Sequence, residues 1–532
     1  MHELGGHAIG SEVHLLGQSL LQLGRQLFLQ KNYSEARESL SLSLEFQPDA
    51  AETWFEMGNV LHAAGSHAEA EERYAGAVAL DKSYAEAWYN LGVVRLAQGH
   101  VTPARQAFER TVMLRPSHAE AHNNLAITMQ ATGQWEEAIA HYRQASYLSP
   151  SFAAPQYNLG MLLQECGEFE DAAATYATLV EQHPEHTDGC NNLANVFLEL
   201  GMVRESRIAY DAVLARDPRH PEANWNRGLL QLQMGEWEAG WANYEWRLRQ
   251  PRSNLDRFPL DMPRWDGQVR KGHRILLIAE QGLGDALQFL RYAAVVKNAV
   301  AGSGGSVIVE CHKPLLAVAA RAEGVDAVCA IGAPRPPYDC WVPLMSVPAA
   351  MRLGGPPAPA NGGYLAADGA LAAAWAEKLG ALCGEKRRVG VVWSGNPSFT
   401  ANAKRTLAPQ DVRNLTAGHP DIAFVSLQKG VAMIDGAGLL DPAHNGETME
   451  DLAAILANLD LVVTVDTSVA HLAGAMGCPT WVMLPHAADW RWMKNREDSP
   501  WYPSMRLFRQ ESRGNWAPVV EAVKSELALL VE

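Results

Sequence analysis

The first half of the chain repeats a pattern of small and large apolar positions every 34 residues. The small position is occupied by Gly24, Gly58, Gly92, Ala126, Gly160, Ala194 and Gly228. A large apolar residue follows 16 positions after each, at Leu40, Tyr74, Phe108, Tyr142, Tyr176, Tyr210 and Tyr244. Two helices per repeat explain the pattern, because a small residue lets helices cross closely while a large one fills the gap beside it. The spacing predicts seven helix pairs over 17–252, after an N-terminal tail over 1–16.

This repeat resembles the tetratricopeptide repeat, whose units stack into a superhelix with a long concave face. One position of the first helix is Asn in five successive units: Asn90, Asn124, Asn158, Asn192 and Asn226. An amide can both donate to and accept from a peptide backbone, so this row can hold an extended segment of a partner protein. Asn is also common at this position in such repeats generally, and both interpretations stay open.

After residue 252, short apolar runs alternate with helical stretches. We expect strands at 274–281, 306–311 and 326–332, and again at 387–393, 422–427, 461–466 and 480–485. Runs of this length are typical of buried parallel strands. The alternation predicts an α/β fold with two Rossmann-like lobes, over 273–385 and 386–532, joined through a Pro- and Gly-rich stretch at 333–363. Residues 253–272, rich in Pro, Arg and Asp, form the expected linker between repeats and lobes.

Composition limits the possible partners. A net charge of −16 argues against binding duplex DNA or an anionic membrane through bulk charge. No uncharged apolar run reaches the ~18–20 residues that span a bilayer, and the N-terminus does not resemble a signal peptide. Seven scattered Cys without a C-x-x-C pair indicate a cytoplasmic protein with reduced thiols. His2 and His7 lie five positions apart rather than the four of a zinc-protease helix, so we expect no metal site.

The most specific polar motif follows the run at 461–466. Thr467 and Ser468 are favourable N-cap residues for the next helix, whose free N–H groups suit a phosphate. His471 lies on the first turn, within reach of a ribose, a phosphate or Asp466. A capped helix without any ligand explains the same residues.

A second motif follows the first strand of the α/β half. Gly282 and Gly284 let the backbone approach a ligand closely, and Asp285 opens the next helix. Asp285 is either a helix cap or a general base that takes a proton from a hydroxyl group.

A third group lies in the polar loop after 387–393. Lys404 and Arg405 can neutralise a leaving phosphate, with Asn396 in the same loop, and Gln428 follows another strand. A solvated loop is the alternative. Trp490, Arg491, Trp492 and Arg496 belong to a segment over 490–513 that either lines the cleft between the lobes or serves their packing.

Together the motifs resemble heptosyltransferase-like glycosyltransferases of the GT-B fold that carry tetratricopeptide repeats. The segments that carry the likeness are AEQGLGDALQFLRY, VGVVWSGNPSFTANAKRT, DLVVTVDTSVAHLAGAMGCPTWVMLP and WRWMKNREDSPWYPSMRLFRQ. Heptosyltransferases have Asp-Thr-Gly-x-x-His where this chain has Ser468 in place of the Gly. The layout is also similar to O-GlcNAc transferase and to bacterial flagellin glycosyltransferases.

This resemblance implies inverting, metal-independent transfer of a sugar from a nucleotide-sugar to a hydroxyl group of a protein, for example flagellin, held by the repeats. Asp285 would be the base, and the N–H groups after Asp466, with Lys404 and Arg405, would hold the leaving phosphate. The nucleotide-sugar is a substrate, and no cofactor is implied. Two alternatives stay open: an acceptor in lipopolysaccharide core or another glycan, and an inactive scaffold. The sugar, the nucleotide, the acceptor and the oligomeric state are not specified by the sequence.

Overall fold

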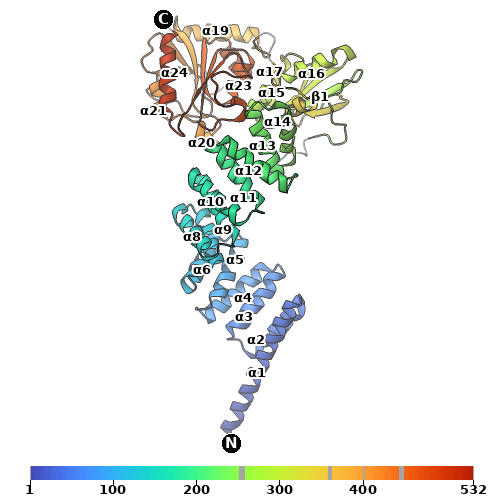
Figure 1. The fold of residues 1–532 in the computed structure, drawn as a ribbon, viewed down its shortest axis with the longest axis vertical. Helices are drawn as coiled ribbons and strands as arrows, with labels where there is room; N and C mark the ends of the chain where they lie inside the picture. Colours follow the sequence, from blue (N-terminus) through green and yellow to red (C-terminus); the bar gives the residue numbers. More distant parts are fainter. Residues whose placement is uncertain (1, 251–257, 358–361, 399–401, 443–447, 531–532) are drawn as a thin grey trace. The chain divides into compact units, whose positions relative to one another are not determined.

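The computed structural model describes residues 2–250, 258–357, 362–398, 402–442 and 448–530, with side chains from residue 13 onward. The chain divides into two compact units, Met1–Ala212 and Val213–Glu532 (Figure 1). The predicted domains divide the chain at residue 252 instead. The difference arises because the last repeat packs within the α/β unit.

The first unit consists of helices that pack against their neighbours along the chain. Their bounds are α1 (His2–Leu29), α2 (Tyr33–Phe46), α3 (Ala51–Ala63), α4 (His67–Leu80), α5 (Ala85–Ala97), α6 (Val101–Leu114), α7 (Ala119–Ala131), α8 (Trp135–Leu148), α9 (Ala153–Cys166), α10 (Phe169–Gln182), α11 (Thr187–Glu199) and α12 (Val203–Arg216), the last of which contains the unit boundary. Residues 2–16 of the expected tail are instead helical, as the first part of α1.

The 34-residue pattern has the expected physical basis in helix crossing. A Cβ atom added to Gly58 would lie 2.6 Å from the ring of Tyr74, and one added to Gly92 would lie 2.6 Å from the ring of Phe108. Both rings are fully buried. Each large residue therefore fills the space that its small partner leaves, and the array of helix pairs is confirmed.

After the end of α12, the second unit contains the last helix pair and then the first parallel sheet. The pair is α13 (Pro221–Gln233) and α14 (Trp237–Tyr244), continued by the 3-10 turn η1 (Glu245–Arg249). The sheet has the order β3-β2-β1-β4, with strands β1 (Arg274–Ile278), β2 (Ser306–Cys311), β3 (Ala327–Ala330) and β4 (Cys340–Pro343). Its helices are α15 (Leu283–Phe289), α16 (Tyr292–Val300), α17 (Leu316–Ala320) and α18 (Val347–Ala350).

The second sheet is also parallel and has the order β6-β5-β7-β8-β9. Its strands are β5 (Arg387–Val392), β6 (Ile422–Ser426), β7 (Leu461–Val465), β8 (Thr480–Leu484) and β9 (Met505–Arg509). Its helices are α19 (Gly369–Cys383), α20 (Asn402–Arg405), α21 (Pro409–Thr416), α22 (Met449–Leu456), α23 (Ser468–Ala475) and α24 (Ala517–Leu529), with the 3-10 turn η6 (Trp490–Trp492). The two-lobed α/β fold is confirmed, and β4 and β9 are additional to the predicted strands.

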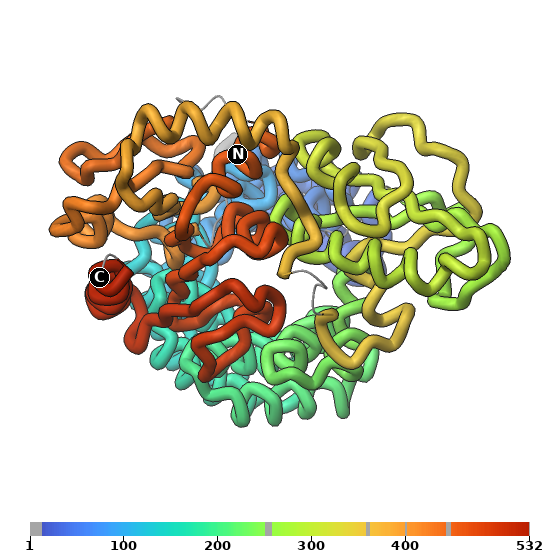
Figure 2. Tube along the Cα trace, turned by 90° about the horizontal axis from the view of Figure 1, so that it is seen from above, coloured from blue at the N-terminus to red at the C-terminus, as the bar shows by residue number. Residues whose placement is uncertain are grey.

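An aromatic cluster joins the last repeat to both lobes; α13 and α14 of this repeat are green in Figures 1 and 2. The ring of Trp241 on α14 lies 6.0 Å from Phe289 of the first lobe, and 5.8 and 6.2 Å from Trp490 and Trp501 of the second. Arg247 of η1 adds a buried ion pair with Glu280, just after β1. The last repeat is therefore part of the core of the second unit.

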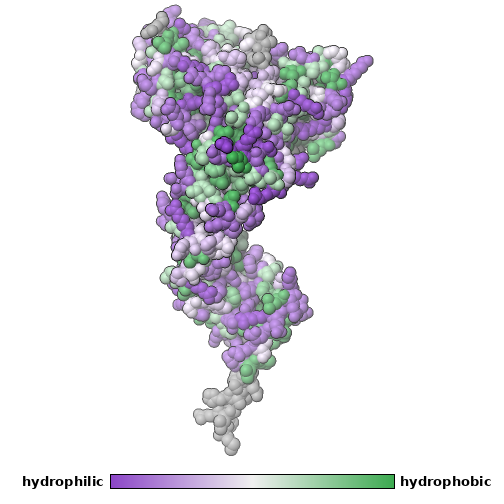
Figure 3. All heavy atoms as spheres, viewed as in Figure 1, coloured by the Kyte–Doolittle hydropathy of each residue, from purple (hydrophilic) through white to green (hydrophobic). Residues whose placement is uncertain are grey.

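The face of the molecule shown in Figure 3 is mostly polar, and the hydrophobic areas on it are smaller. None of the helices in the described part of the chain has an apolar stretch long enough to cross a bilayer.

Candidate functional site

Two helices that follow parallel strands begin side by side where the lobes meet. Helix α15 follows β1, and α23 follows β7. Both strands lie where the strand order of their sheet reverses, which is where ligands bind in open α/β sheets. A Cβ atom added to Gly284 would lie 2.8 Å from Cδ2 of His471 and 3.6 Å from Cα of Ser468. We expected a ligand to approach the backbone closely at Gly284, and in the structure residues of the second lobe do so.

The carboxylate of Asp285 has two partners. Its Oδ2 accepts a hydrogen bond from the backbone N–H of Gly282 at 2.9 Å, which fixes the start of α15. Its Oδ1 is ion-paired with Nη2 of Arg491, from the other lobe. Asp285 therefore has the contacts of a helix cap, and it also faces the shared site.

Arg491 is bound on three sides. Its Nε donates to Oε1 of Gln288 at 2.6 Å, its Nη1 lies 2.9 Å from Oδ1 of Asp489, and its Nη2 contacts Asp285. Only 8% of the side chain is exposed. Burial alone would lower the pKa of Arg491, but the charges of Asp489 and Asp285 raise it above its ordinary value. The guanidinium is therefore a fixed positive charge between the lobes.

His471 is a buried, neutral side chain at neutral pH. Its Nδ1 lies 2.9 Å from the hydroxyl of Tyr502, and its ring stacks on Trp492 with 5.5 Å between centroids. Burial holds the pKa of His471 well below its ordinary value, and the positive charges of Arg491 and other arginines add to this.

Asp466 lies at the end of β7, with Oδ1 3.9 Å from Nε2 of His471. Burial, together with the negative charge of Asp489, raises the pKa of Asp466 to about 6. A carboxylate with this pKa changes its charge close to neutral pH, as groups at functional sites often do.

The start of α23 is not capped by a side chain of its own. Thr467 is the N-cap residue, as predicted, but its hydroxyl makes no bond to the first turn and lies 3.2 Å from that of Thr464. Ser468 is the first helical residue. The first N–H groups of a helix have no partner within the helix, so they suit an anion that approaches from outside.

The loop after β5 is held by two amide side chains. Oε1 of Gln428 accepts hydrogen bonds from the backbone N–H groups of Trp393 and Ser394, at 3.1 and 2.9 Å. Oδ1 of Asn402 accepts one from the N–H of Gly395 at 2.8 Å. Gln428 therefore positions the loop, and these contacts show no ligand role for it.

Arg405 is packed against this loop. Its Nη2 lies 2.7 Å from where a Cβ atom on Gly395 would be, and its charge lowers the pKa of Asp466 in part. Arg405 thus belongs to the cluster. Lys404 is exposed on the same turn, and Asn396 is exposed with its Oδ1 accepting from Ser398.

Four contributors were not singled out from the sequence: Gln288, Asp489, Tyr502 and Asn402. A signal existed for Gln288, because it lies one turn after Asp285 on the same helix and must share its face. Asn402 and Asp489 lie close in sequence to Arg405 and Arg491. Nothing in the local sequence around Tyr502 indicated its contact with His471.

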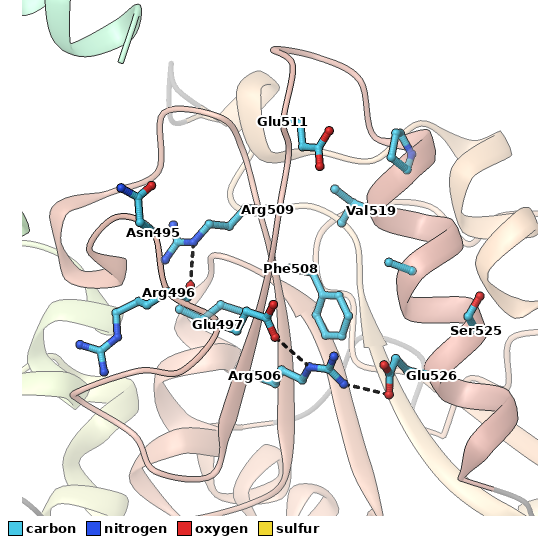
Figure 4. A pocket seen from close by; sticks show the side chains of 13 residues that line it. Asn495, Arg496, Glu497, Arg506, Phe508, Arg509, Glu511, Val519, Ser525 and Glu526 are labelled. Carbon is cyan, nitrogen blue, oxygen red and sulfur yellow. Dashed lines mark hydrogen bonds and ion pairs between the residues drawn. The ribbon is translucent and has the colours of Figure 1, made fainter. Parts of the chain in front are cut away.

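A separate hollow of about 680 Å³ lies on the second lobe, between β9 and α24 (Figure 4). In Figure 4 Arg506 interacts with Glu497 and Glu526, and Arg509 donates to the backbone of Arg496. Of the four residues singled out in the segment 490–513, Arg496 lines this hollow. None of the predicted phosphate-binding residues lines it.

The Asn row of the first unit is connected to its own neighbours. The contacts of the side-chain nitrogens are Asn90 to Asn59 at 3.0 Å, Asn124 to Tyr89 at 3.3 Å, Asn158 to Asn123 at 3.1 Å and Asn192 to Tyr176 at 3.3 Å. All four side chains are half-buried, as is Asn226 on α13 of the second unit. One N–H of each of the amides of Asn90, Asn124, Asn158 and Asn192 is thus engaged within the array, and peptide binding by this row stays a prediction.

Among the described residues, we find no further candidate site made of metal ligands or cysteine thiols. No group of three or more His, Cys, Asp or Glu side chains in these ranges is placed to hold a metal ion. All seven cysteines are free thiols, and five of them are buried.

Comparison with known proteins identifies the helical part. Family models described as TPR repeat or tetratricopeptide repeat match residues 58–99, 85–118, 131–165, 157–201 and 191–240. The N-terminal part contains tetratricopeptide repeats. Protein FlbA of Caulobacter vibrioides is 29% identical over 325 residues, which cover 57% of this chain and 54% of FlbA. The chain thus spans about half the length of this curated relative.

Among solved structures, repeat proteins are similar to parts of the chain. YrrB, described as a TPR protein with an unusual peptide-binding site, is 21% identical, with a TM-score of 0.34, and covers 36% of this chain and 100% of its own. MamA is 21% identical, with a TM-score of 0.31, and covers 32% of this chain and 93% of its own.

Proposed function

We propose that the second unit transfers a sugar from a nucleotide-sugar to a hydroxyl group of a protein, and that the repeats bind this protein. The observation that carries the proposal is the cluster of Asp285, Arg405, Asp466, His471 and Arg491. These side chains gather where α15 and α23 begin, at the carboxyl ends of parallel strands. The family resemblance of the surrounding segments supports the same chemistry.

In the proposed reaction, the acceptor oxygen attacks the anomeric carbon while the bond from that carbon to the phosphate oxygen breaks. The proton of the acceptor hydroxyl passes to the carboxylate of Asp285 as general base. The leaving nucleotide, a nucleoside diphosphate or, for a CMP-sugar, CMP, takes up the bonding electron pair. The N–H groups at the start of α23 and the guanidinium of Arg405 offset its negative charge.

The acceptor would bind along the concave face of the repeats. Each amide of the Asn row has two N–H groups and a carbonyl oxygen, although the carbonyl oxygen of Asn124 already accepts from Asn123 at 3.1 Å. Main-chain groups of an extended segment are suitable partners for both. Flagellin is an acceptor of this kind implied by the resemblance.

Thermal stabilisation by nucleotide-sugars tests the proposal on the full chain. A ligand that binds only the folded state, present at 100 times its Kd, stabilises that state by about 2.7 kcal/mol. We expect one of the UDP-, GDP-, ADP- or CMP-sugars to raise the melting temperature, and Arg405→Ala to abolish the effect. Arg387→Ala is the matched control, because Arg387 is exposed at the opposite end of β5 from the cluster. If no nucleotide-sugar stabilises the folded protein, the proposal is wrong.

A non-catalytic scaffold is the second candidate, and one observation favours it. Both oxygens of the Asp285 carboxylate are engaged, by the Gly282 N–H and by Arg491. Both contacts fit a structural role for Asp285, as a helix cap and as the ion-pair partner of Arg491. Mass spectrometry of an acceptor incubated with the stabilising nucleotide-sugar separates the two candidates, because a scaffold leaves the acceptor mass unchanged.

A further inference from the structure

The guanidinium of Arg491 is fixed on two edges and meets Asp285 on the third. Its Nε bond to Gln288 at 2.6 Å and its Nη1 contact with Asp489 at 2.9 Å hold the group in place. Nη2 is directed at Asp285. One partner can therefore be replaced while the other two keep the side chain in position.

The third partner of Arg491, Asp285, lies beside the start of α23. Asp285 lies next to Gly284, which contacts His471 and Ser468 at the start of α23. The positive charge of Arg491 also acts on both Asp466 and His471. Arg491 is thus close to the helix start that makes no side-chain cap bond.

We propose that Arg491 exchanges Asp285 for the diphosphate of the bound donor. This inference rests on the proposed function and concerns the same site. A guanidinium presents parallel N–H groups that fit two oxygens of a phosphate as well as those of a carboxylate, so the exchange preserves its hydrogen bonding.

The exchange explains how Asp285 can serve as base although it is engaged in the free protein. The donor diphosphate takes over the Nη2 contact, and Asp285 keeps its bond to the Gly282 N–H. One carboxylate oxygen is then available for the proton of the acceptor hydroxyl. The base becomes competent only when the donor is in place, which predicts that the donor binds before the proton transfer is possible.

Inorganic pyrophosphate is a suitable probe, because it carries the diphosphate without nucleotide or sugar. We would measure its affinity for the full chain by isothermal titration calorimetry. Asp285→Asn removes the competing charge, so it should bind pyrophosphate about tenfold more tightly than the wild-type chain. A purely structural role for Asp285 predicts equal or weaker binding instead.

Variants of Arg491 test whether this residue binds the diphosphate. Arg491→Ala should weaken pyrophosphate binding at least tenfold, and Arg491→Lys should restore part of the loss because it keeps the charge. Arg496→Ala is the control and should bind as the wild type does, since Arg496 is paired with Asp498 at 2.5 Å and lines the separate hollow. Circular dichroism shows whether each variant is folded. If Arg491→Ala does not fold, Asp285→Asn still tests the exchange, because it keeps Arg491 in place.

The outcomes separate this inference from the proposed function. Unchanged or weaker binding by Asp285→Asn, or no binding of millimolar pyrophosphate by either form, overturns the exchange even if a nucleotide-sugar stabilises the protein. Tighter binding by Asp285→Asn supports the exchange even if every nucleotide-sugar fails, in which case only the proposed function falls.

Discussion

Replacement of Trp241 by Ala should destabilise the α/β unit and leave the rest of the repeat array unaffected. Trp241 is only 2% exposed, although it belongs to a helix of the last repeat. Its ring lies within 6.2 Å of Phe289, Trp490 and Trp501, which come from both lobes. The substitution therefore opens a cavity where three parts of the second unit meet.

The cost follows from the size of the lost side chain. Truncation of a buried Trp to Ala costs about 3–5 kcal/mol. One kcal/mol shifts the Tm of a domain of 150–250 residues by about 2–4 °C, and that of a larger unit by less. We expect the transition of the second unit to fall by about 5–10 °C in differential scanning calorimetry of the full chain.

Two controls identify the transitions. Tyr142→Ala removes a ring that is 1% exposed in the first unit, and it should lower the other transition. Trp135→Ala, at a side chain that is 40% exposed, should move neither by more than a degree or two. If Trp241→Ala lowers the same transition as Tyr142→Ala, then the last repeat belongs energetically to the array and our division of the chain is wrong.

Three further predictions concern single contacts. Gly284→Ala places a methyl group 2.8 Å from the ring of His471, so it should cost about 1–3 kcal/mol and lower the same transition as the Trp substitution. Burial lowers the pKa of both His122 and His141, so the unfolded chain binds protons that the folded array does not. The melting temperature of the first unit should therefore fall as the pH drops below about 6.5, and His141→Gln should reduce the slope of melting temperature against pH. Asp466, with a pKa of about 6, contributes stability that is lost as the pH rises through 6, so urea unfolding at pH 7.5 should show Asp466→Asn to be more stable than the wild type.

The repeat array could be predicted because its contacts are local in sequence. Gly58 packs on Tyr74 and Gly92 on Phe108, each pair 16 positions apart, and the same pair recurs in every unit. The 34-residue period does not indicate where the array ends as a folding unit. That limit depends on Trp241 meeting Trp490, and a repeat pattern holds no information about partners outside the repeats.

The lobes were predictable where strands are continuous apolar runs. β4 was missed because it is only four residues long, ends at Pro343 and lies in a Pro- and Gly-rich stretch. β9 was missed because its two arginines, Arg506 and Arg509, interrupt the apolar pattern of the edge strand.

The candidate site was partly predictable from topology. Asp285 and Asp466 could be placed together because carboxyl ends of parallel strands carry the ligand-binding loops. The partner of Asp285 could not, because Arg491 is 206 residues away in the sequence and reaches it only through the packing of one lobe on the other. Likewise, the sequence did not indicate that Lys404 is exposed while Arg405 is packed. The orientation of these neighbours depends on how the four-residue helix α20 is turned.

The aromatic cluster around Trp241 has a consequence for synthesis of the chain on the ribosome. Trp490 and Trp501 emerge roughly 250 residues after Trp241, which takes about 12–50 s at 5–20 residues per second. The helices before residue 212 make their contacts with near neighbours and can fold during this interval. Until then the face of Trp241 that packs on Trp490 and Trp501 has no partner, so this helix pair exposes apolar surface to aggregation and to chaperones during synthesis.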